Sequence, residues 1–362
     1  MKRAIVVGSL MLTISQWYSF FLVSQLSLFI FPIVSGVVIF VLGFIGRPLG
    51  GIIFGHIGDK ISRKTALFLT SLLLILSSIL VIILYSCYSV LAFRLFQGLS
   101  LGGEWGGAST VLIESYSSSR YRGFIASIVQ LSVPIAIILS STTIFVLTLI
   151  NLSLWKFSLI PIILLTLLST YLIKDVSISG MHISKKLPLI EAIKHDWRNI
   201  LKGIGIKISE SAIFYIFTSY IFSKNPSAST LVTLSISLQL FMIPLFGYLS
   251  DIIGRRKVII IGVLLIIPGA ILFPGLAGEL ILSLSDSALY APQSAILTEI
   301  FNRKYRFTAS NFSYQVASLI GGALVPSVLR LTNYPVVLVV LPYVIITLVS
   351  VILVKETKGR EV

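Results

Sequence analysis

The chain consists almost entirely of apolar stretches of about 20 residues, and each is long enough to cross a hydrocarbon core about 30 Å thick. Backbone amides in lipid must find partners within the protein. These stretches lack the alternation that is typical of membrane β-strands, so helices are expected. The composition agrees, because only 11% of the residues are charged, whereas a soluble domain carries about 25%. The sequence therefore predicts an all-α membrane protein that crosses the lipid bilayer many times.

We expect twelve transmembrane helices in two six-helix bundles. The predicted spans are 5–30, 34–57, 65–85, 88–116, 123–148, 153–173, 199–222, 228–249, 258–273, 278–300, 307–330 and 335–354. The ninth span is the shortest and contains Pro268. If a pair of spans in this region were missed or merged, ten helices would remain.

The net positive charge of +15 is distributed unevenly among the joints between these spans. Every second joint is rich in Lys and Arg, while the joints between them hold only Lys156, Lys224 and Arg330. This asymmetry is the positive-inside pattern of membrane proteins, so we do not expect the charge to serve nucleic-acid binding. It predicts a multi-pass protein of the cell membrane with both termini in the cytoplasm.

Disulfide, metal and enzymatic chemistry find no support in the sequence. Cys87 is the only cysteine, and no group of Cys and His has the spacing of a metal site. No phosphate-binding loop, zinc-protease helix or serine-nucleophile elbow occurs, and the joints are too short for a catalytic domain. We therefore expect no cofactor and no enzymatic activity.

A repeated motif divides the chain into two similar halves. The pattern G-x3-D-x3-R-[RK] begins at Gly55 and again at Gly247, and the polar stretch 174–198 separates the two copies. We predict an N-terminal six-helix bundle at 1–173, a cytoplasmic linker at 174–198 and a C-terminal six-helix bundle at 199–362. Two parallel halves with a site between them at mid-depth are typical of rocking transporters.

Two longer motifs carry a resemblance to a known family. Residues 47–59 read RPLGGIIFGHIGD, and residues 94–108 read RLFQGLSLGGEWGGA. With these motifs the chain resembles the major facilitator superfamily, and within it the metabolite:proton symporters, which carry shikimate, ketoglutarate, citrate or betaine. The segments EIF at 299–301 and KETKG at 355–359 are also similar. The resemblance implies a secondary transporter, expected to be monomeric, that moves a small organic solute by alternating access, with a carboxylated metabolite as the expected substrate.

Charged side chains inside a span cost a few kcal/mol or more at the bilayer centre, so they are functional candidates. Arg47 and Arg94 have no opposite charge three or four positions away, and a guanidinium can hold the carboxylate of an organic acid. Because the resembled family also carries betaine, an architectural role for Arg47 stays open. Glu104 lies among glycines and is either a proton carrier or a permanent partner of an Arg. Lys207 and Glu210 are spaced to neutralise each other.

The first span departs from the family pattern at two positions. Proton-coupled members have E-W-Y-D-F there, whereas this chain has QWYSF at 16–20. Gln16 and Ser19 can hydrogen-bond a solute but cannot take up a proton near neutral pH. Coupling must then use Glu104, Glu210 or Asp286, or the protein is a facilitator, an exchanger or a solute sensor that does not transport. The candidates for substrate binding or coupling are Gln16, Tyr18, Ser19, Arg47, Arg94, Gln97, Glu104 and Asp286.

Charged residues at the cytoplasmic ends of the spans form a second candidate set. In the resembled superfamily such groups form an inner gate that holds the halves together while the solute site faces outward. A single exposed pair is worth about 0–1 kcal/mol, so several must act together to bias a two-state equilibrium of a few kcal/mol. The alternative is that they serve topology and solubility alone. The predicted gate residues are Asp59, Arg63, Glu114, Arg122, Asp251, Arg255, Glu299 and Arg306.

Overall fold

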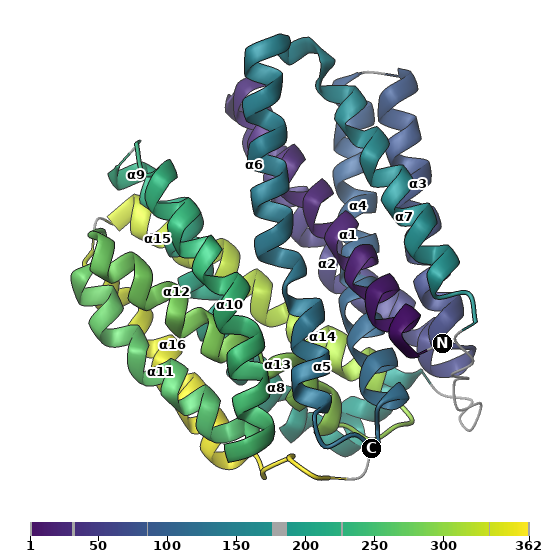
Figure 1. Cartoon of the computed structure of the whole chain (residues 1–362), viewed down its shortest axis with the longest axis vertical. Helices are drawn as coiled ribbons and strands as arrows, with labels where there is room; N and C mark the ends of the chain where they lie inside the picture. Colours follow the sequence, from purple (N-terminus) through teal and green to yellow (C-terminus); the bar gives the residue numbers. More distant parts are fainter. Residues whose placement is uncertain are drawn as a thin grey trace. The chain divides into compact units, whose positions relative to one another are not determined.

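The computed structural model describes residues 2–30, 33–84, 86–175, 187–225, 227–332 and 334–360, and their secondary structure is helical (Figure 1). Within these ranges, eight helices are long and apolar enough to cross a membrane by length and composition alone. Residues 176–186 of the predicted linker lie outside the described residues.

The described helices combine into twelve crossing elements, because several adjoining helices continue one another. The first four elements are α1 (Lys2–Ile30), α2 (Ile33–Lys60), α3 (Arg63–Leu84) and α4 (Cys87–Ser115). The fifth element consists of α5 (Arg122–Gln130) and α6 (Ser132–Ile150). The sixth consists of the 3-10 helix η1 (Leu152–Leu159) and α7 (Ile160–Leu172).

The six later elements follow the same scheme. The seventh consists of α8 (Pro188–Tyr215), the π-helical turn η2 (Ile216–Tyr220) and α9 (Ile221–Lys224). The eighth, ninth and tenth are α10 (Ser229–Ile253), α11 (Arg255–Leu272), and α12 (Leu276–Tyr290) with α13 (Gln293–Glu299). The last two are α14 (Arg306–Ser318) with the π-helical η3 (Leu319–Leu324) and α15 (Val325–Thr332), and then α16 (Val336–Leu353). The predicted twelve-helix fold is confirmed, and the short ninth span is a helix of its own.

Two of the breaks within these elements coincide with prolines, which lack a backbone N–H. Pro134, in the first turn of α6, has no N–H to donate to the carbonyl of Gln130, where α5 ends. Pro292 stands between α12 and α13 in the same way. Gly321 and Gly322 lie within the π-helical η3. Proline therefore accounts for the breaks after α5 and after α12.

Helices α2 and α4 touch backbone to backbone. A Cβ atom added to Gly50 would lie 1.9 Å from the carbonyl oxygen of Leu99, and one added to Gly102 would lie 2.0 Å from the carbonyl oxygen of Arg47. Small residues allow such close approach between membrane helices. This contact explains one glycine in each long motif, Gly50 and Gly102, and it fixes Arg47 beside α4.

The chain divides into two compact units, and each combines segments from both predicted halves. The first unit contains Met1–Ser115, Ser132–Leu189 and Lys304–Asn311, and the second contains Tyr116–Leu131, Ile190–Arg303 and Phe312–Val362. Helix α5 therefore belongs to the second unit, and the start of α14 belongs to the first. The predicted division at residues 174–198 stays a prediction.

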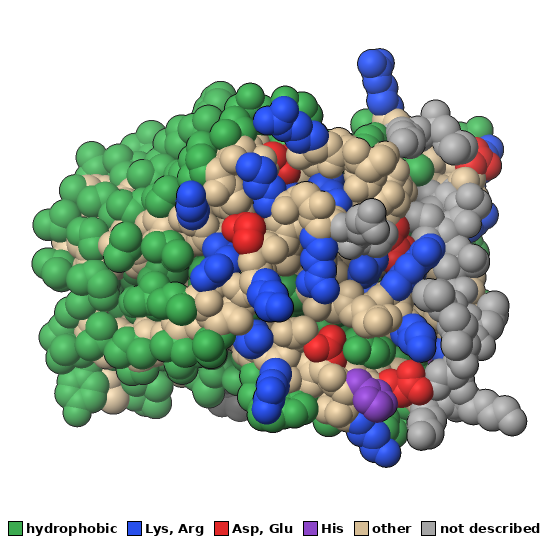
Figure 2. Space-filling view, turned by 90° about the horizontal axis from the view of Figure 1, so that it is seen from below, with side chains coloured by type: hydrophobic (Ala, Val, Ile, Leu, Met, Phe, Trp, Pro, Cys, Tyr) green, Lys and Arg blue, Asp and Glu red, His purple; other side chains and the backbone are tan. Residues whose placement is uncertain are grey.

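The surface carries many large apolar side chains. Leu149, Phe241 and Leu331 are each at least 70% exposed. Apolar residues exposed along spanning helices are typical of a surface that faces lipid. On the face seen from below, Lys and Arg side chains gather, with hydrophobic side chains beside them (Figure 2).

Candidate functional site

A ladder of three hydrogen bonds joins α1 to α4 in the first unit. The rungs pair Ser19 with Gln97, Gln16 with Ser100 and Thr13 with Glu104, at 2.8, 2.7 and 2.6 Å. On both helices these residues recur every three or four positions, so they share one face of each helix. All six side chains are fully buried. Four of the predicted site residues are thus brought together by two antiparallel helices.

Arg94 lies beside this ladder and is held by several oxygen atoms. Its guanidinium donates to the carbonyl oxygens of Ile39 and Phe20, at 2.9 and 3.2 Å, and to the hydroxyl of Ser24 at 2.9 Å. It also donates to the side-chain oxygen of Gln97. The rigid fork of an arginine can serve these acceptors on three helices at once. This geometry favours a role for Arg94 in holding α1, α2 and α4 together.

Arg47 has different surroundings, formed by aromatic rings. Its guanidinium carbon lies 5.1 Å from the ring centre of Trp17, 5.6 Å from that of Phe20 and 5.5 Å from that of Phe44. Ring faces attract a cation, and more strongly where water is excluded. Arg47 is 1% exposed, so the structure holds a buried positive charge against an aromatic surface at the middle of α2.

The Glu104 carboxylate is fully buried and has little polar support. One oxygen bonds Thr13, and the other has no hydrogen-bond partner among the described residues. The Thr13 hydroxyl also lies 2.8 Å from the carbonyl oxygen of Ser9, which can only accept. A hydroxyl has one proton, so Thr13 cannot donate to both at once. If Thr13 donates to Ser9, the contact with Glu104 needs a proton on the carboxyl group.

Two predicted candidates lie apart from the ladder. The Tyr18 hydroxyl is 2.9 Å from the Thr143 hydroxyl, a contact between α1 and α6 in the first unit. Asp286 belongs to α12 in the second unit, where it accepts a hydrogen bond from the side chain of Gln239 at 2.7 Å. Lys207 and Glu210, predicted to neutralise each other, form an ion pair.

The sequence analysis missed Glu279, which is fully buried in the first turn of α12. It accepts a hydrogen bond from Ser235 at 3.4 Å. The positive end of the helix dipole favours its charge by only about 0.3–1 kcal/mol, which is less than the few kcal/mol that an intramembrane charge costs. Glu279 was overlooked because it stands at the start of the predicted span 278–300, where charges are commonly solvated. The sequence signal that could have identified Glu279 is its spacing of seven residues from Asp286, which places both carboxyl groups on one face of a helix.

The first gate cluster consists of Asp59, Arg63, Glu114 and Arg306 in the first unit. Asp59 accepts hydrogen bonds from the backbone N–H groups of Phe307 and Thr308, at 3.2 and 2.8 Å, in the first turn of α14. Asp59 also pairs with Arg63. Arg63 and Arg306 each lie 3.3 Å from Glu114. The Asp of the motif thus caps a helix from the other half of the sequence.

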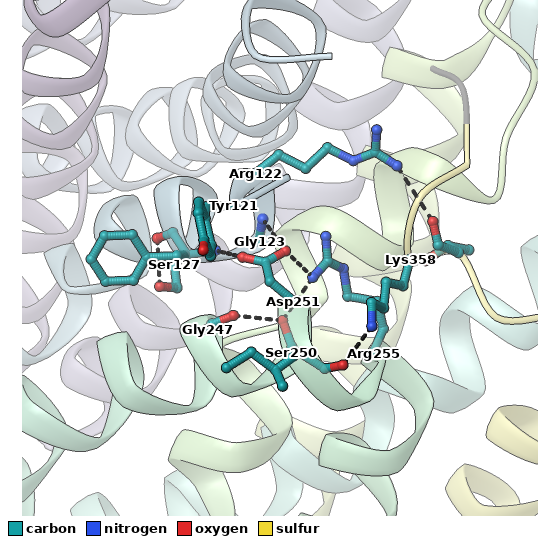
Figure 3. Close-up of polar contacts among 12 residues, drawn as sticks. Tyr121, Arg122, Gly123, Ser127, Gly247, Ser250, Asp251, Arg255 and Lys358 are labelled. Carbon is teal, nitrogen blue, oxygen red and sulfur yellow. Dashed lines mark hydrogen bonds and ion pairs between the residues drawn. The ribbon is translucent and has the colours of Figure 1, made fainter. Parts of the chain in front are cut away.

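The second gate cluster, Asp251, Arg255, Glu299 and Arg122, repeats this geometry in the second unit. Figure 3 shows Asp251, Arg255 and Arg122 of this cluster. Asp251 accepts hydrogen bonds from the backbone N–H groups of Gly123 and Phe124, at 3.0 and 2.7 Å, in the first turn of α5. It pairs with Arg255, while Glu299 lies 2.6 Å from Arg122 and 3.5 Å from Arg255. All eight predicted gate residues therefore lie in two matching clusters.

Each cluster is buried, so its charges depend on one another. Burial lowers the pKa of Arg255, but the carboxylates of Glu299 and Asp251 outweigh this effect and raise that pKa above its ordinary value. The first glycine of each motif copy allows the close approach that burial requires. A Cβ atom on Gly55 would lie 2.7 Å from Cα of Thr308, and one on Gly247 would lie 2.1 Å from the Ser127 hydroxyl.

Comparison with known proteins agrees with this architecture. Residues 4–174 match the family model described as sugar (and other) transporter, and residues 200–361 match the one described as Major Facilitator Superfamily. The chain is 27% identical to the inner membrane metabolite transport protein YhjE of Escherichia coli, with 99% of this chain and 95% of that protein covered. It is also 27% identical to the shikimate transporter of Escherichia coli, over 90% of this chain and 86% of that protein.

A solved structure with the same fold is the proton:xylose symporter XylE bound to 6-bromo-6-deoxy-D-glucose. The TM-score is 0.78 at 15% identity, and 99% of this chain and 97% of that one are covered. The resemblance seen in the sequence is confirmed, and the chain belongs to the major facilitator superfamily as a multi-pass membrane transporter of metabolites, not an enzyme.

Proposed function

We propose that this protein moves a small carboxylated metabolite across the cell membrane by rocker-switch alternating access, with both termini in the cytoplasm. The observation that supports the mechanism best is the repeated gate geometry. In each unit the Asp of the motif accepts two backbone N–H groups from the first turn of a helix in the other sequence half. The excess of Lys and Arg at this end of the spans supports its cytoplasmic location.

The gate contacts have the strength that a switch needs. A carboxylate cap at a helix N-terminus is worth about 0.5–2 kcal/mol. Ion pairs with Arg63 and Arg255 add to each cap. Two such clusters together supply a few kcal/mol, which is the scale that biases an equilibrium between two conformations. Release of both clusters would then allow the site to face the other side of the membrane.

Arg47 is our choice for the group that binds the substrate carboxylate. Arg94 serves main-chain and side-chain oxygens of its own unit, which favours a positioning role. Arg47 instead presents its charge among ring faces, a surrounding that suits a small acid with a flat or cyclic carbon skeleton. Similarity to the shikimate transporter supports the same substrate class.

Uptake by purified protein in liposomes tests this assignment, with labelled shikimate as the probe. Wild-type protein should take up the label, and Arg47→Ala should reduce uptake at least tenfold. Lys64→Ala is the matched control, because Lys64 lies in the first turn of α3 with an exposed side chain, and it should transport normally. Full uptake by Arg47→Ala would remove Arg47 from the site. Failure of the wild type with shikimate and with other organic acids would overturn the carboxylate assignment.

The gate role has its own test. Asp59→Asn and Asp251→Asn keep an acceptor oxygen but remove the charge that pairs with Arg63 or Arg255. Each should lower the uptake rate, while binding of substrate to the detergent-solubilised protein remains. Normal transport by both variants would show that these charges serve topology alone.

A further inference from the structure

The second unit contains a row of buried carboxyl groups whose charges are only partly compensated. Glu279 and Asp286 lie seven residues apart on α12, so they occupy the same face two turns from each other. Glu279 is fully buried, and Asp286 is 1% exposed. Glu210 on α8 lies within electrostatic reach of Asp286.

Each of the two α12 carboxylates is held on one side only. The Glu279 and Asp286 side chains accept one hydrogen bond each, from Ser235 and Gln239, which are neighbours on one face of α10. The second oxygen of each carboxylate is buried and has no hydrogen-bond partner in the part of the chain that the structure describes. A fixed anion would be expected to have its oxygens satisfied, because unmet buried acceptors are costly.

Nearby cationic side chains do not neutralise the Glu279 and Asp286 carboxylates. Lys207 lies near Asp286, but its ion pair is with Glu210. No ion pair of Glu279 or Asp286 occurs among the described residues. The dipole of α12 helps only Glu279, because its effect fades beyond the first turn. Two carboxylates in a low-dielectric interior therefore need another positive species, and a proton is the one that fits an isolated oxygen.

We propose that Glu279 and Asp286 are two proton-binding sites that couple transport to a proton gradient from the second unit, in place of the acids missing at Gln16 and Ser19. A proton from water at the N-terminal end of α12 binds the Glu279 carboxylate and neutralises it. A second proton binds the Asp286 carboxylate and neutralises it in the same way, and release of both protons on the other side of the membrane restores the two charges. The helical rise separates the two residues by about 10 Å, so they bind protons separately. This inference rests on the proposed transport function.

Other titratable groups lie around the Glu279 and Asp286 carboxyl groups. Glu210 and Lys207 on α8 act on Asp286. The ammonium group of Lys207 lies over the rings of Tyr290 and Tyr314, at 4.9 and 4.3 Å. Tyr220 in η2, which packs against α12, is also buried. On α10, α11 and α13 the remaining charged groups lie at the gate end, and they are Asp251, Arg255, Arg256, Lys257 and Glu299.

Infrared spectroscopy tests proton binding without any substrate. Protonated carboxyl groups have a carbonyl stretching band that carboxylates lack, and the band shifts in heavy water. Near neutral pH, wild-type protein should show such bands, and Glu279→Gln and Asp286→Asn should each remove one. Glu191→Gln is the control, because Glu191 lies in the cytoplasmic first turn of α8, and it should change none. Thermal unfolding of each variant verifies that it is folded.

Transport with labelled shikimate supplies the second readout. In both variants, the accumulation driven by an imposed pH gradient should fall at least tenfold. Exchange of labelled for unlabelled shikimate at equal pH should remain. Absence of the bands from the wild type, or gradient-driven accumulation retained in both variants, would overturn the proposal. Exchange without any gradient-driven accumulation in the wild type would also overturn it but would leave the transport function intact. No uptake of any kind would count against the proposed substrate, while the infrared result would still decide proton binding.

Discussion

Asp59 caps the first turn of α14 through Thr308, whose backbone N–H and hydroxyl both donate to the same carboxylate oxygen, at 2.8 and 2.6 Å. The two residues come from opposite halves of the sequence. Four N–H groups at the start of any helix have no partner within the helix, and Asp59 supplies an acceptor together with a charge that the helix dipole favours. The contact therefore stabilises both α14 and the gate.

Thr308→Val should destabilise the protein measurably. It keeps the side-chain shape but removes the hydroxyl that donates to Asp59. Loss of a hydrogen bond to a buried charged group costs about 1.5–3 kcal/mol. Thr332→Val is the control, because the Thr332 hydroxyl is exposed and makes only local hydrogen bonds, to the carbonyl of Val328 and from the N–H of Tyr334. It should change stability by less than about 0.5 kcal/mol. Thermal unfolding in detergent measures both. Equal stability of the two variants would contradict the capping account.

Glu356→Ala should loosen the start of α11. The exposed Glu356 carboxylate accepts hydrogen bonds from the backbone N–H groups of Arg255 and Arg256, at 3.0 and 3.2 Å, and so acts as a helix cap supplied by the C-terminal segment. Removing such a cap costs about 0.5–2 kcal/mol. Hydrogen exchange of these two amides should accelerate several-fold, whereas Lys355→Ala, with an exposed side chain, should leave them unchanged. If exchange stays slow in Glu356→Ala, another group caps α11.

Gly50→Ala should prevent correct packing of α2 on α4. The added Cβ atom would lie 1.9 Å from the carbonyl oxygen of Leu99, and a backbone atom cannot move aside as a flexible side chain can. Overpacking usually costs about 1–3 kcal/mol, and this backbone contact belongs at the upper end. Gly275→Ala meets its nearest atom at 3.2 Å and should be tolerated. The yield of monodisperse protein after detergent extraction compares them, and similar yields would be evidence against backbone contact.

Arg94→Lys should destabilise the first unit although it conserves the charge. The guanidinium serves the Phe20 and Ile39 carbonyls and Ser24 at once, whereas an ammonium group cannot reproduce that fork. Each buried acceptor left without a donor costs about 1–3 kcal/mol. The exposed Arg330, changed to Lys in the same way, should have no comparable effect. A normal melting temperature for Arg94→Lys would argue that the fork is not required.

The helical architecture could be predicted because span length and hydropathy report directly on the solvent around each segment. The repeated D-x3-R pattern also pointed to Asp59, Arg63, Asp251 and Arg255, which lie in the two gate clusters, while a gate function stays a prediction. The partners of these residues could not be predicted from sequence. Contacts between Asp59 and Thr308, or between Asp251 and Gly123, depend on how helices that are distant in sequence meet.

The polar interior was harder to predict for a similar reason. Sequence shows that Arg94 lacks a charged partner nearby but not that main-chain oxygens satisfy it. Nor does it show that Glu279 is buried, because residues at the edge of a predicted span are usually solvated. Burial of a single side chain is decided by its neighbours in space.

The boundary between the compact units cuts through three helical elements, after Leu131, after Leu189 and after Asn311. Neither sequence half can therefore finish its own unit, since each borrows a helix end made by the other half. During synthesis the earlier half must wait for residues 304–311 before its last polar groups are satisfied. A chain truncated before α14 would leave the Asp59 carboxylate without the two backbone N–H groups that donate to it.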